Sequence, residues 1–294
     1  MFRYLSRVVP MLALLFLVGA CATVTVDLPA VTETPTSERM PGKIVWRDLL
    51  TNDPAASQRF YGELFGWEFE SVSRGYTLIR HNGRMIGGMI DTIALNGRDD
   101  ISQWVVLMSV ENVDAAVAAV ASGGGKVIAE PTDLQRRGRI AVAADAEGAL
   151  FALLQTRDGD PLDREPEING FLWDELWTRR IDDATTFYEK LTGLVVGSLD
   201  KDTDGTPAAN YRLLKDGDTP RIGLMPHPLE GLGPVWVSYL RVRNPAEICE
   251  QVEALGGRVI VEAQQRPIGG QVAMIAGPSG AGIALQTWPI RNED

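Results

Sequence analysis

An internal duplication constrains this chain of 294 residues more than any other feature. The segment IVWRDLLTND at 44–53 matches FLWDELWTRR at 171–180, and GALFALLQ at 148–155 matches GAGIALQT at 280–287. The first pair of segments starts 127 residues apart and the second pair 132 residues apart, so the similarity extends along both halves. Repetition at this spacing indicates two copies of one folded unit in tandem.

The repeat also suggests where the domains begin and end. Between the halves lies a charged stretch with two prolines, which is typical of a linker. We expect a first domain over 43–157, a linker over 158–167 and a second domain over 168–290. A hydrophobic content of 45% with 23% charged residues is ordinary for globular proteins and excludes wholesale disorder.

Each half reads as two smaller units in which a strand, a helix and three further strands follow one another. In the first unit the apolar segment 44–50 suits a strand. Asp53 and Pro54 then suit the N-cap and the first position of a helix, and Gly66 suits its end. The turn dipeptide Asn82-Gly83 favours a hairpin between two of the later strands.

This order of elements resembles the vicinal-oxygen-chelate superfamily of glyoxalases, bleomycin-resistance proteins and extradiol dioxygenases. The resemblance rests on WRDLLTNDPAASQRFYGELFGW at 46–67, VENVDAA at 110–116 and GRIAVAADAEGALFALLQ at 138–155. It implies an α+β fold with two tandem domains. Each domain would consist of two βαβββ units that form a curled, cup-shaped mixed sheet with the helices outside.

The resemblance also implies a divalent metal in the cup, held by His, Gln or Glu side chains on strands. In this chain the corresponding positions fall on Trp46 and Trp173 in the first unit of each half, and near Val105 and Val237 in the second units. The closing position falls on Gln155. Indole and isopropyl groups cannot ligate a metal, and metal sites of the zinc type keep at least three protein ligands. We therefore expect no metal in either cup.

Organic ligand binding is the alternative use of such a cup. Side chains two residues apart on a strand share a face, so Asp48 lies beside Trp46 and Glu175 beside Trp173, and we expect Gln155 opposite Trp46. An aromatic wall next to a carboxylate suits a flat or cationic organic molecule. These five residues are the candidate ligand-binding residues, although tryptophans in a small cup can also serve as plain core packing. No catalytic residue is assigned.

A short acidic run offers one possible cofactor site. Asp200, Asp202 and Asp204, followed by Gly205, match the opening of a calcium-binding loop. The twelfth position of that pattern, where a bidentate glutamate belongs, is Tyr211. The same run also fits a solvated acidic hairpin, so a structural calcium ion is the only cofactor under consideration.

The N-terminus has the features of a targeting segment. Arg3 and Arg7 precede the apolar run 8–20, which is shorter than the roughly 20 residues of a spanning helix. The run ends in Val-Gly-Ala before Cys21, which resembles a bacterial lipobox. We expect a lipoprotein signal peptide over 1–20, lipidation of Cys21 and an extended tether over 21–42, with an ordinary secretory peptide as the alternative. The resemblance places the protein in the cell envelope, on the periplasmic face of the outer membrane if the organism is Gram-negative.

The charge and these motifs leave three functions open. A formal net charge of −11 without a basic stripe excludes a nucleic-acid partner. The leading hypothesis is a lipid-anchored envelope protein that binds a small organic molecule in metal-free cups, so its partners would be the membrane and that ligand. A lyase, isomerase or dioxygenase-type enzyme of the same superfamily and an envelope interaction module are the alternatives. The sequence does not set the oligomeric state.

Overall fold

The computed structural model describes residues 28–96, 101–197, 211–229, 231–266 and 270–288. The predicted signal peptide 1–20, Cys21, the start of the tether and the three aspartates of the calcium pattern lie outside these residues. Within the described residues, no helix is long and apolar enough to cross a bilayer.

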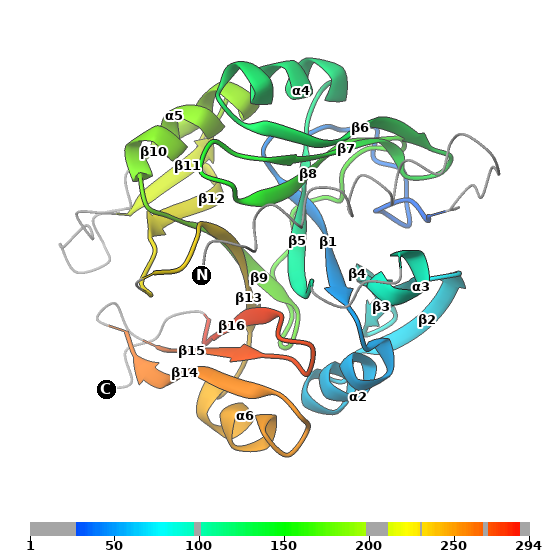
Figure 1. Cartoon of the computed structure of the whole chain (residues 1–294), viewed down its shortest axis with the longest axis vertical. Coiled ribbons are helices and arrows are strands. Elements are labelled where there is room, and N and C mark those ends of the chain that lie inside the picture. Colours follow the sequence, from blue (N-terminus) through cyan, green and yellow to red (C-terminus); the bar gives the residue numbers. More distant parts are fainter. Residues whose placement is uncertain (1–27, 97–100, 198–210, 230, 267–269, 289–294) are drawn as a thin grey trace.

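Each half of the chain forms one sheet of eight strands (Figure 1). The elements of the first half are β1 (Ile44–Thr51), α2 (Pro54–Phe65), β2 (Glu68–Ser73), β3 (Tyr76–His81), β4 (Arg84–Asp91), α3 (Thr92–Asn96), β5 (Gln103–Ser109), α4 (Val113–Ser122), β6 (Lys126–Leu134), β7 (Gly138–Ala144) and β8 (Leu150–Thr156). Those of the second half are β9 (Phe171–Thr178), α5 (Ile181–Thr192), β10 (Val195–Gly197), β11 (Arg212–Asp216), β12 (Thr219–Pro226), β13 (Val235–Arg241), α6 (Pro245–Val252), β14 (Arg258–Gln265), β15 (Gln271–Ala276) and β16 (Gly282–Gln286).

The two sheets have the same topology. The first has the order β2-β3-β4-β1-β5-β8-β7-β6 and the second has β10-β11-β12-β9-β13-β16-β15-β14. In both sheets the first strand of each unit pairs in parallel with the last strand of its own unit, and the two first strands pair antiparallel at the centre. This arrangement confirms the expected α+β fold with two βαβββ units in each tandem domain.

Helix α2 begins and ends where the sequence predicts. The Asp53 side chain accepts a hydrogen bond from the backbone N–H of Ala56, and Pro54 occupies the first turn. Gly66 ends the helix with φ of 69°, in the left-handed region where a side chain would add strain, and its N–H bonds to the Gly62 carbonyl.

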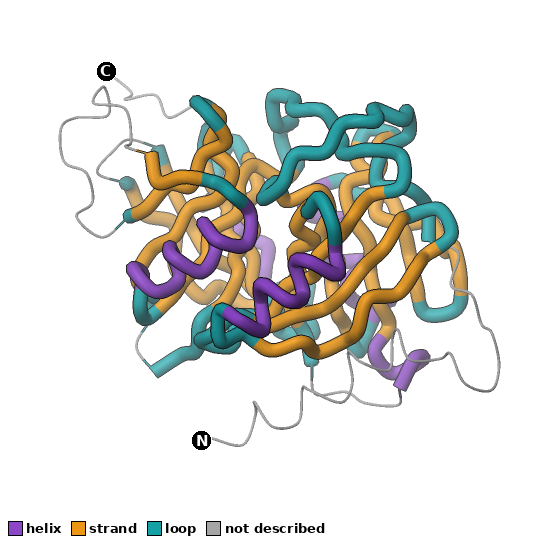
Figure 2. The backbone as a smooth tube through the Cα atoms, turned by 90° about the horizontal axis from the view of Figure 1, so that it is seen from above, coloured by secondary structure: helices purple, strands orange, loops and turns teal. Residues whose placement is uncertain are grey.

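The two domains pack through the faces that carry the helices. Helices α4 and α5 lie side by side on one side of the molecule, as Figures 1 and 2 show, and α2 and α6 contact each other on the other side. One apolar cluster accordingly joins the second unit of the first domain to the first unit of the second. Another joins the first unit to the last. The hydrophobic core therefore continues from one domain into the other.

A buried ion pair lies between the two sheets. Arg47 on β1 and Asp174 on β9 occupy equivalent positions in the repeat, 127 residues apart. The Arg47 guanidinium donates to both carboxylate oxygens of Asp174, and its Nε lies 3.0 Å from Oδ1. Ser238 Oγ donates to the same Oδ1 at 2.6 Å, and the guanidinium also stacks on the Phe171 ring at 4.5 Å. Residues that are equivalent by sequence thus form the central polar contact between the domains.

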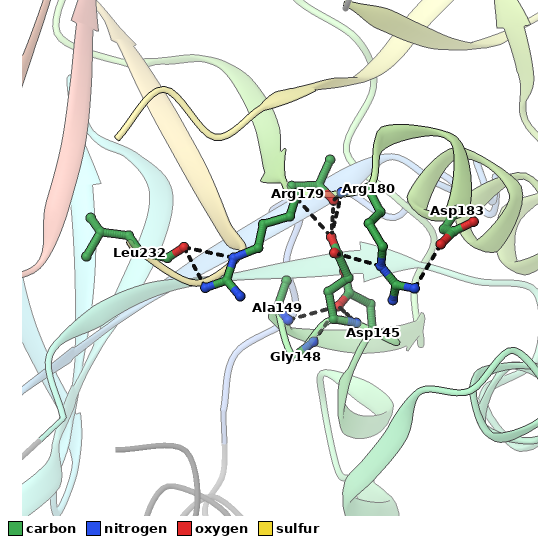
Figure 3. A network of polar contacts seen from close by, with 9 residues as sticks. Asp145, Gly148, Ala149, Arg179, Arg180, Asp183 and Leu232 are labelled. Atoms are coloured by element: carbon green, nitrogen blue, oxygen red, sulfur yellow. Dashed lines mark hydrogen bonds and ion pairs between the residues drawn. The ribbon is translucent and has the colours of Figure 1, made fainter. Parts of the chain in front are cut away.

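The first domain caps a helix of the second. Arg180 at the start of α5 provides no capping side chain. Instead, Glu147 in the β7–β8 turn accepts hydrogen bonds from the backbone N–H groups of Arg179 and Arg180, at 3.1 and 3.3 Å, and from the Thr178 hydroxyl. Asp145 fixes that turn by accepting three backbone N–H bonds, including those of Gly148 and Ala149 (Figure 3).

Glu147→Gln is expected to lower the free energy of unfolding by about 1–3 kcal/mol at neutral pH, because charge-assisted hydrogen bonds are lost. Burial raises the pKa of Glu147, but the bonds from Thr178 and Arg180 outweigh it and hold that pKa below its usual range. A depressed folded-state pKa stabilises the protein above the ordinary glutamate pKa of about 4.3, and this stabilisation is lost as the pH falls through the folded-state value. Urea unfolding of both proteins from pH 7 to pH 3 should therefore converge at acid pH, whereas a difference that does not depend on pH would contradict this role.

The described part of the predicted tether is attached to the first domain. Residues 28–42 form no helix or strand, yet Leu28 and Val31 are buried. Farther along, Met40 N–H donates to the Asp160 carboxylate at 2.6 Å, and Gly42 N–H donates to the Ser109 carbonyl at 2.9 Å. From Leu28 onward the chain therefore lies on the folded body.

Candidate functional site

The face of each sheet turned away from its helices forms what we call the first cup (β1–β8) and the second cup (β9–β16). In the first cup, Asp48 Oδ1 accepts hydrogen bonds from Trp46 Nε1 at 3.0 Å and from the Tyr76 hydroxyl at 2.9 Å. Asp48 is only 6% exposed, and burial raises the pKa of its carboxyl, although the positive charge of Arg137 acts in the opposite direction. The predicted neighbours Trp46 and Asp48 thus do share the cup face.

Arg137, from the β6–β7 turn, covers Trp46. Its guanidinium lies 4.4 Å from the indole ring, and its side chain is 1% exposed. Its Nε donates to the Pro29 carbonyl at 2.8 Å, and Nη2 lies 3.4 Å from the Tyr76 hydroxyl. Its buried Nη1 has no hydrogen-bond partner within the described part of the chain.

The second cup repeats this arrangement around Glu175, which is 4% exposed. Glu175 Oε1 accepts from the Tyr211 hydroxyl at 2.9 Å, and Oε2 accepts from the Tyr239 hydroxyl at 2.6 Å. Trp173 Nε1 donates to the Tyr211 oxygen at 3.2 Å, and Trp177 Nε1 lies 3.4 Å from Oε2. Burial, and then the negative charge of Glu175, raise the pKa of both tyrosines, so their hydroxyls stay protonated and act as donors.

A glycine makes room for the tyrosine in each cup. Gly88 on β4 pairs with Asp48, and a Cβ atom there would lie 2.0 Å from the Tyr76 hydroxyl. Gly223 on β12 pairs with Glu175, and a Cβ atom there would lie 2.1 Å from the Tyr211 hydroxyl. The repeated tyrosine and glycine are both 135 residues apart, so the similarity of YTLIR at 76–80 to YRLLK at 211–215 could have revealed this pair of tyrosines.

The two cups differ in how far their walls are exposed. Trp46, Tyr76 and Arg137 of the first cup are buried, whereas Trp173 and Tyr211 of the second are partly exposed. Other side chains around the second cup are also partly exposed: Arg266 and the apolar residues Met225, Val235, Val272 and Met274. The second cup therefore presents its aromatic wall to solvent, and the first does not.

The predicted position of Gln155 is wrong. Its side chain accepts a hydrogen bond from the backbone N–H of Val113 at 3.3 Å, at the start of α4 on the helix-bearing face. Neighbouring side chains on a strand alternate between faces, and it is Leu154 that belongs to the first cup. The glutamine that faces a cup is Gln286 in the second domain, where it accepts a bond from Arg266 Nη1 at 2.8 Å.

The fold and the sequence place this protein in a known class: the chain belongs to the glyoxalase/bleomycin resistance protein/dioxygenase superfamily, whose family model matches residues 43–153. A putative glyoxylase, CFP32, of Mycobacterium tuberculosis is 32% identical over 252 residues, covering 83% of this chain and 94% of the relative. The anthracycline biosynthesis protein DnrV of Streptomyces peucetius is 32% identical over 263 residues, with 83% and 93% covered.

Two solved structures share the fold. A Mn(II)-bound glyoxalase from Novosphingobium aromaticivorans has a TM-score of 0.57 and 17% identity, covering 85% of this chain and 83% of its own. An extradiol ring-cleaving dioxygenase from B. fuscum has a TM-score of 0.59 and 14% identity, covering 91% and 76%. At this level of identity the likeness concerns the fold alone.

The residues in the cups do not fit a divalent metal such as the fold family implies. In the described residues, no three His, Cys, Asp or Glu side chains lie close enough together to hold an ion. The first cup offers one carboxylate, Asp48, beside the guanidinium of Arg137, whose positive charge disfavours a cation. Of the two histidines, His81 bonds to the Ile168 carbonyl and His227 accepts a bond from Leu229 N–H.

Proposed function

We propose that this protein is a lipid-anchored envelope protein that binds a small, flat organic molecule in its second cup without a metal. One observation carries the proposal: the partly exposed indole of Trp173 lies next to a buried carboxylate, Glu175, whose two oxygens are fixed by tyrosine hydroxyls. A concave apolar wall with a few fixed polar groups is the usual form of a small-molecule site.

The chemistry of the ligand follows from these groups. Trp173 offers a face for stacking, and the charge of Glu175 favours a ligand with a positive group near the ring. Arg266 can donate to a ligand oxygen at the rim, because its guanidinium bonds to the neutral amide of Gln286 and to no carboxylate among the described residues. Two relatives are named as anthracycline biosynthesis proteins, and anthracyclines are planar molecules of this kind.

Daunorubicin and the planar cation proflavine are suitable probes for the second cup. Trp173→Ala is expected to weaken the binding of both at least tenfold, as followed by their fluorescence, because the stacking surface is removed. Glu175→Gln should weaken them less, since it removes the charge and keeps the shape. Trp288→Ala is the matched control, because Trp288 is 43% exposed and does not belong to the apolar cluster around the second cup. Equal binding by Trp173→Ala and Trp288→Ala would contradict the proposal.

The metal-free state and the anchor have their own tests. Purified protein should contain no stoichiometric transition metal, whereas a metal that is lost on mutating a cup residue would favour the enzyme alternative.

Cys21→Ser should release the protein from membranes, and Cys249→Ser should not, because Cys249 is a buried thiol on α6. Retention of the Cys21→Ser protein in the membrane fraction would contradict lipidation.

A further inference from the structure

The segment Leu28–Val31 occupies the mouth of the first cup. Leu28 and Val31 are 8% and 5% exposed, and Val31 belongs to the same apolar cluster as Trp46 and Leu78. Between them, the Pro29 carbonyl accepts the hydrogen bond from Arg137 Nε. The segment therefore places one apolar side chain, Val31, and one oxygen acceptor, the Pro29 carbonyl, in the cup, as a small ligand would.

The Leu28–Val31 segment does not satisfy all the hydrogen-bond donors of Arg137. A buried guanidinium is normally paired with a carboxylate, often through two parallel hydrogen bonds. Within the described residues Arg137 forms no ion pair, its acceptors are the Pro29 carbonyl and the Tyr76 hydroxyl, and its Nη1 has no partner. The nearby Asp48 carboxylate is instead held by Trp46 and Tyr76. A carboxylate in place of the Pro29 carbonyl would supply the missing acceptor and a counter-charge bonded directly to the guanidinium.

An open groove adjoins the first cup beside the segment. It has a volume of about 610 Å³, its wall includes Pro29 and Arg136, and it shares Leu78 with the apolar cluster around Trp46, so movement of the segment would join the groove to the cup. In the second cup, Trp173 and Tyr211, the counterparts of Trp46 and Tyr76, are partly exposed on the same sheet framework. In the first cup, the Arg137 guanidinium over Trp46 and the Leu28–Val31 segment bonded to it together cover the aromatic wall.

We propose that Leu28–Val31 is a built-in competitor that covers a binding site for a small aromatic carboxylate, with Arg137 as the carboxylate receptor and Trp46 as the apolar wall. This goes beyond the function proposed for the second cup and does not depend on it. Only molecules whose first cup is open can bind the ligand. The apparent affinity is therefore the affinity of the open form multiplied by the fraction of molecules that are open.

The test uses 2-naphthoate as the probe and the neutral 2-naphthamide as its control, with binding measured by calorimetry. All proteins carry Trp173→Ala, so that the second cup does not contribute. Val31→Asn should bind 2-naphthoate at least tenfold more tightly than the parent, because a buried amide loosens the segment. The matched control is Thr34→Asn, at an exposed position three residues after the segment, which should bind like the parent. Arg137→Gln added to Val31→Asn should abolish the gain.

Three results would overturn the proposal: no gain in Val31→Asn over Thr34→Asn, an equal gain for 2-naphthamide, or a gain that survives Arg137→Gln. Since Arg137 is buried and its variant can fail to fold, hydrogen exchange of the unmodified protein gives a second measurement. Saturating 2-naphthoate should speed the exchange of the backbone amides in residues 28–34, because the ligand displaces them. Slower or unchanged exchange there would contradict displacement.

Discussion

Asp174→Ala is expected to lower the free energy of unfolding by about 3–5 kcal/mol, because it leaves the Arg47 guanidinium between the two sheets without its counter-charge. The Asp174 side chain is 3% exposed and that of Arg47 is 14% exposed, so the guanidinium would lose its carboxylate in a largely dehydrated position. Ser238 would also lose its acceptor. Urea unfolding at pH 7, monitored by circular dichroism, measures the change.

An exposed ion pair between the first domain and the linker provides the control. Arg84 and Glu167 have side chains that are 53% and 37% exposed, so Glu167→Ala should change the stability by no more than about 1 kcal/mol. Replacing both Arg47 and Asp174 with leucine should recover much of the loss, because the uncompensated charge is then removed. A loss of less than about 1 kcal/mol in Asp174→Ala would show that the pair does not hold the domains together.

Trp46→Ala is expected to cost about 3–5 kcal/mol of stability, the usual range for truncating a large buried aromatic side chain. Trp46 is 1% exposed, donates to Asp48 and supports the stacked guanidinium of Arg137. Trp173→Ala should cost clearly less, since that indole is already partly exposed. Thermal unfolding of the two variants side by side gives the comparison.

Equal losses from the two tryptophan variants would contradict the difference between the cups. Such a result would mean that Trp173 is as much a part of the core as Trp46, and the case for a ligand wall in the second cup would fail. A small loss in Trp46→Ala alone would mean that the first cup is open in solution.

Much of the fold could be predicted because it depends on local patterns that occur twice. The duplicated strands and the Asp53-Pro54 start gave the order of the elements, and alternation along β1 correctly paired Trp46 with Asp48. The prediction for Gln155 rests on the family resemblance, through the closing position of the family's metal site, and that position does not fix which residue of β8 faces the cup. The residue of β8 that faces the cup there is the neighbouring Leu154.

Other parts of the site depend on contacts that no local pattern contains. Arg137 and Arg266 come from turns, where side chains follow no period, so their positions over the cups could not be read from spacing. Glu147 caps a helix of the other domain, and this contact can be recognised only from the way the two domains pack. Leu28 and Val31 are two apolar residues in a stretch rich in Thr and Pro, and such a composition is typical of a tether.

Attachment of the chain from Leu28 onward has a consequence for a protein lipidated at Cys21. Only seven peptide steps separate the two residues, and a fully extended chain covers at most about 3.6 Å per residue. The opening of the first cup would then stay within about 25 Å of the headgroups. Pulling or shearing forces on the anchor would act directly on the residues that close that opening.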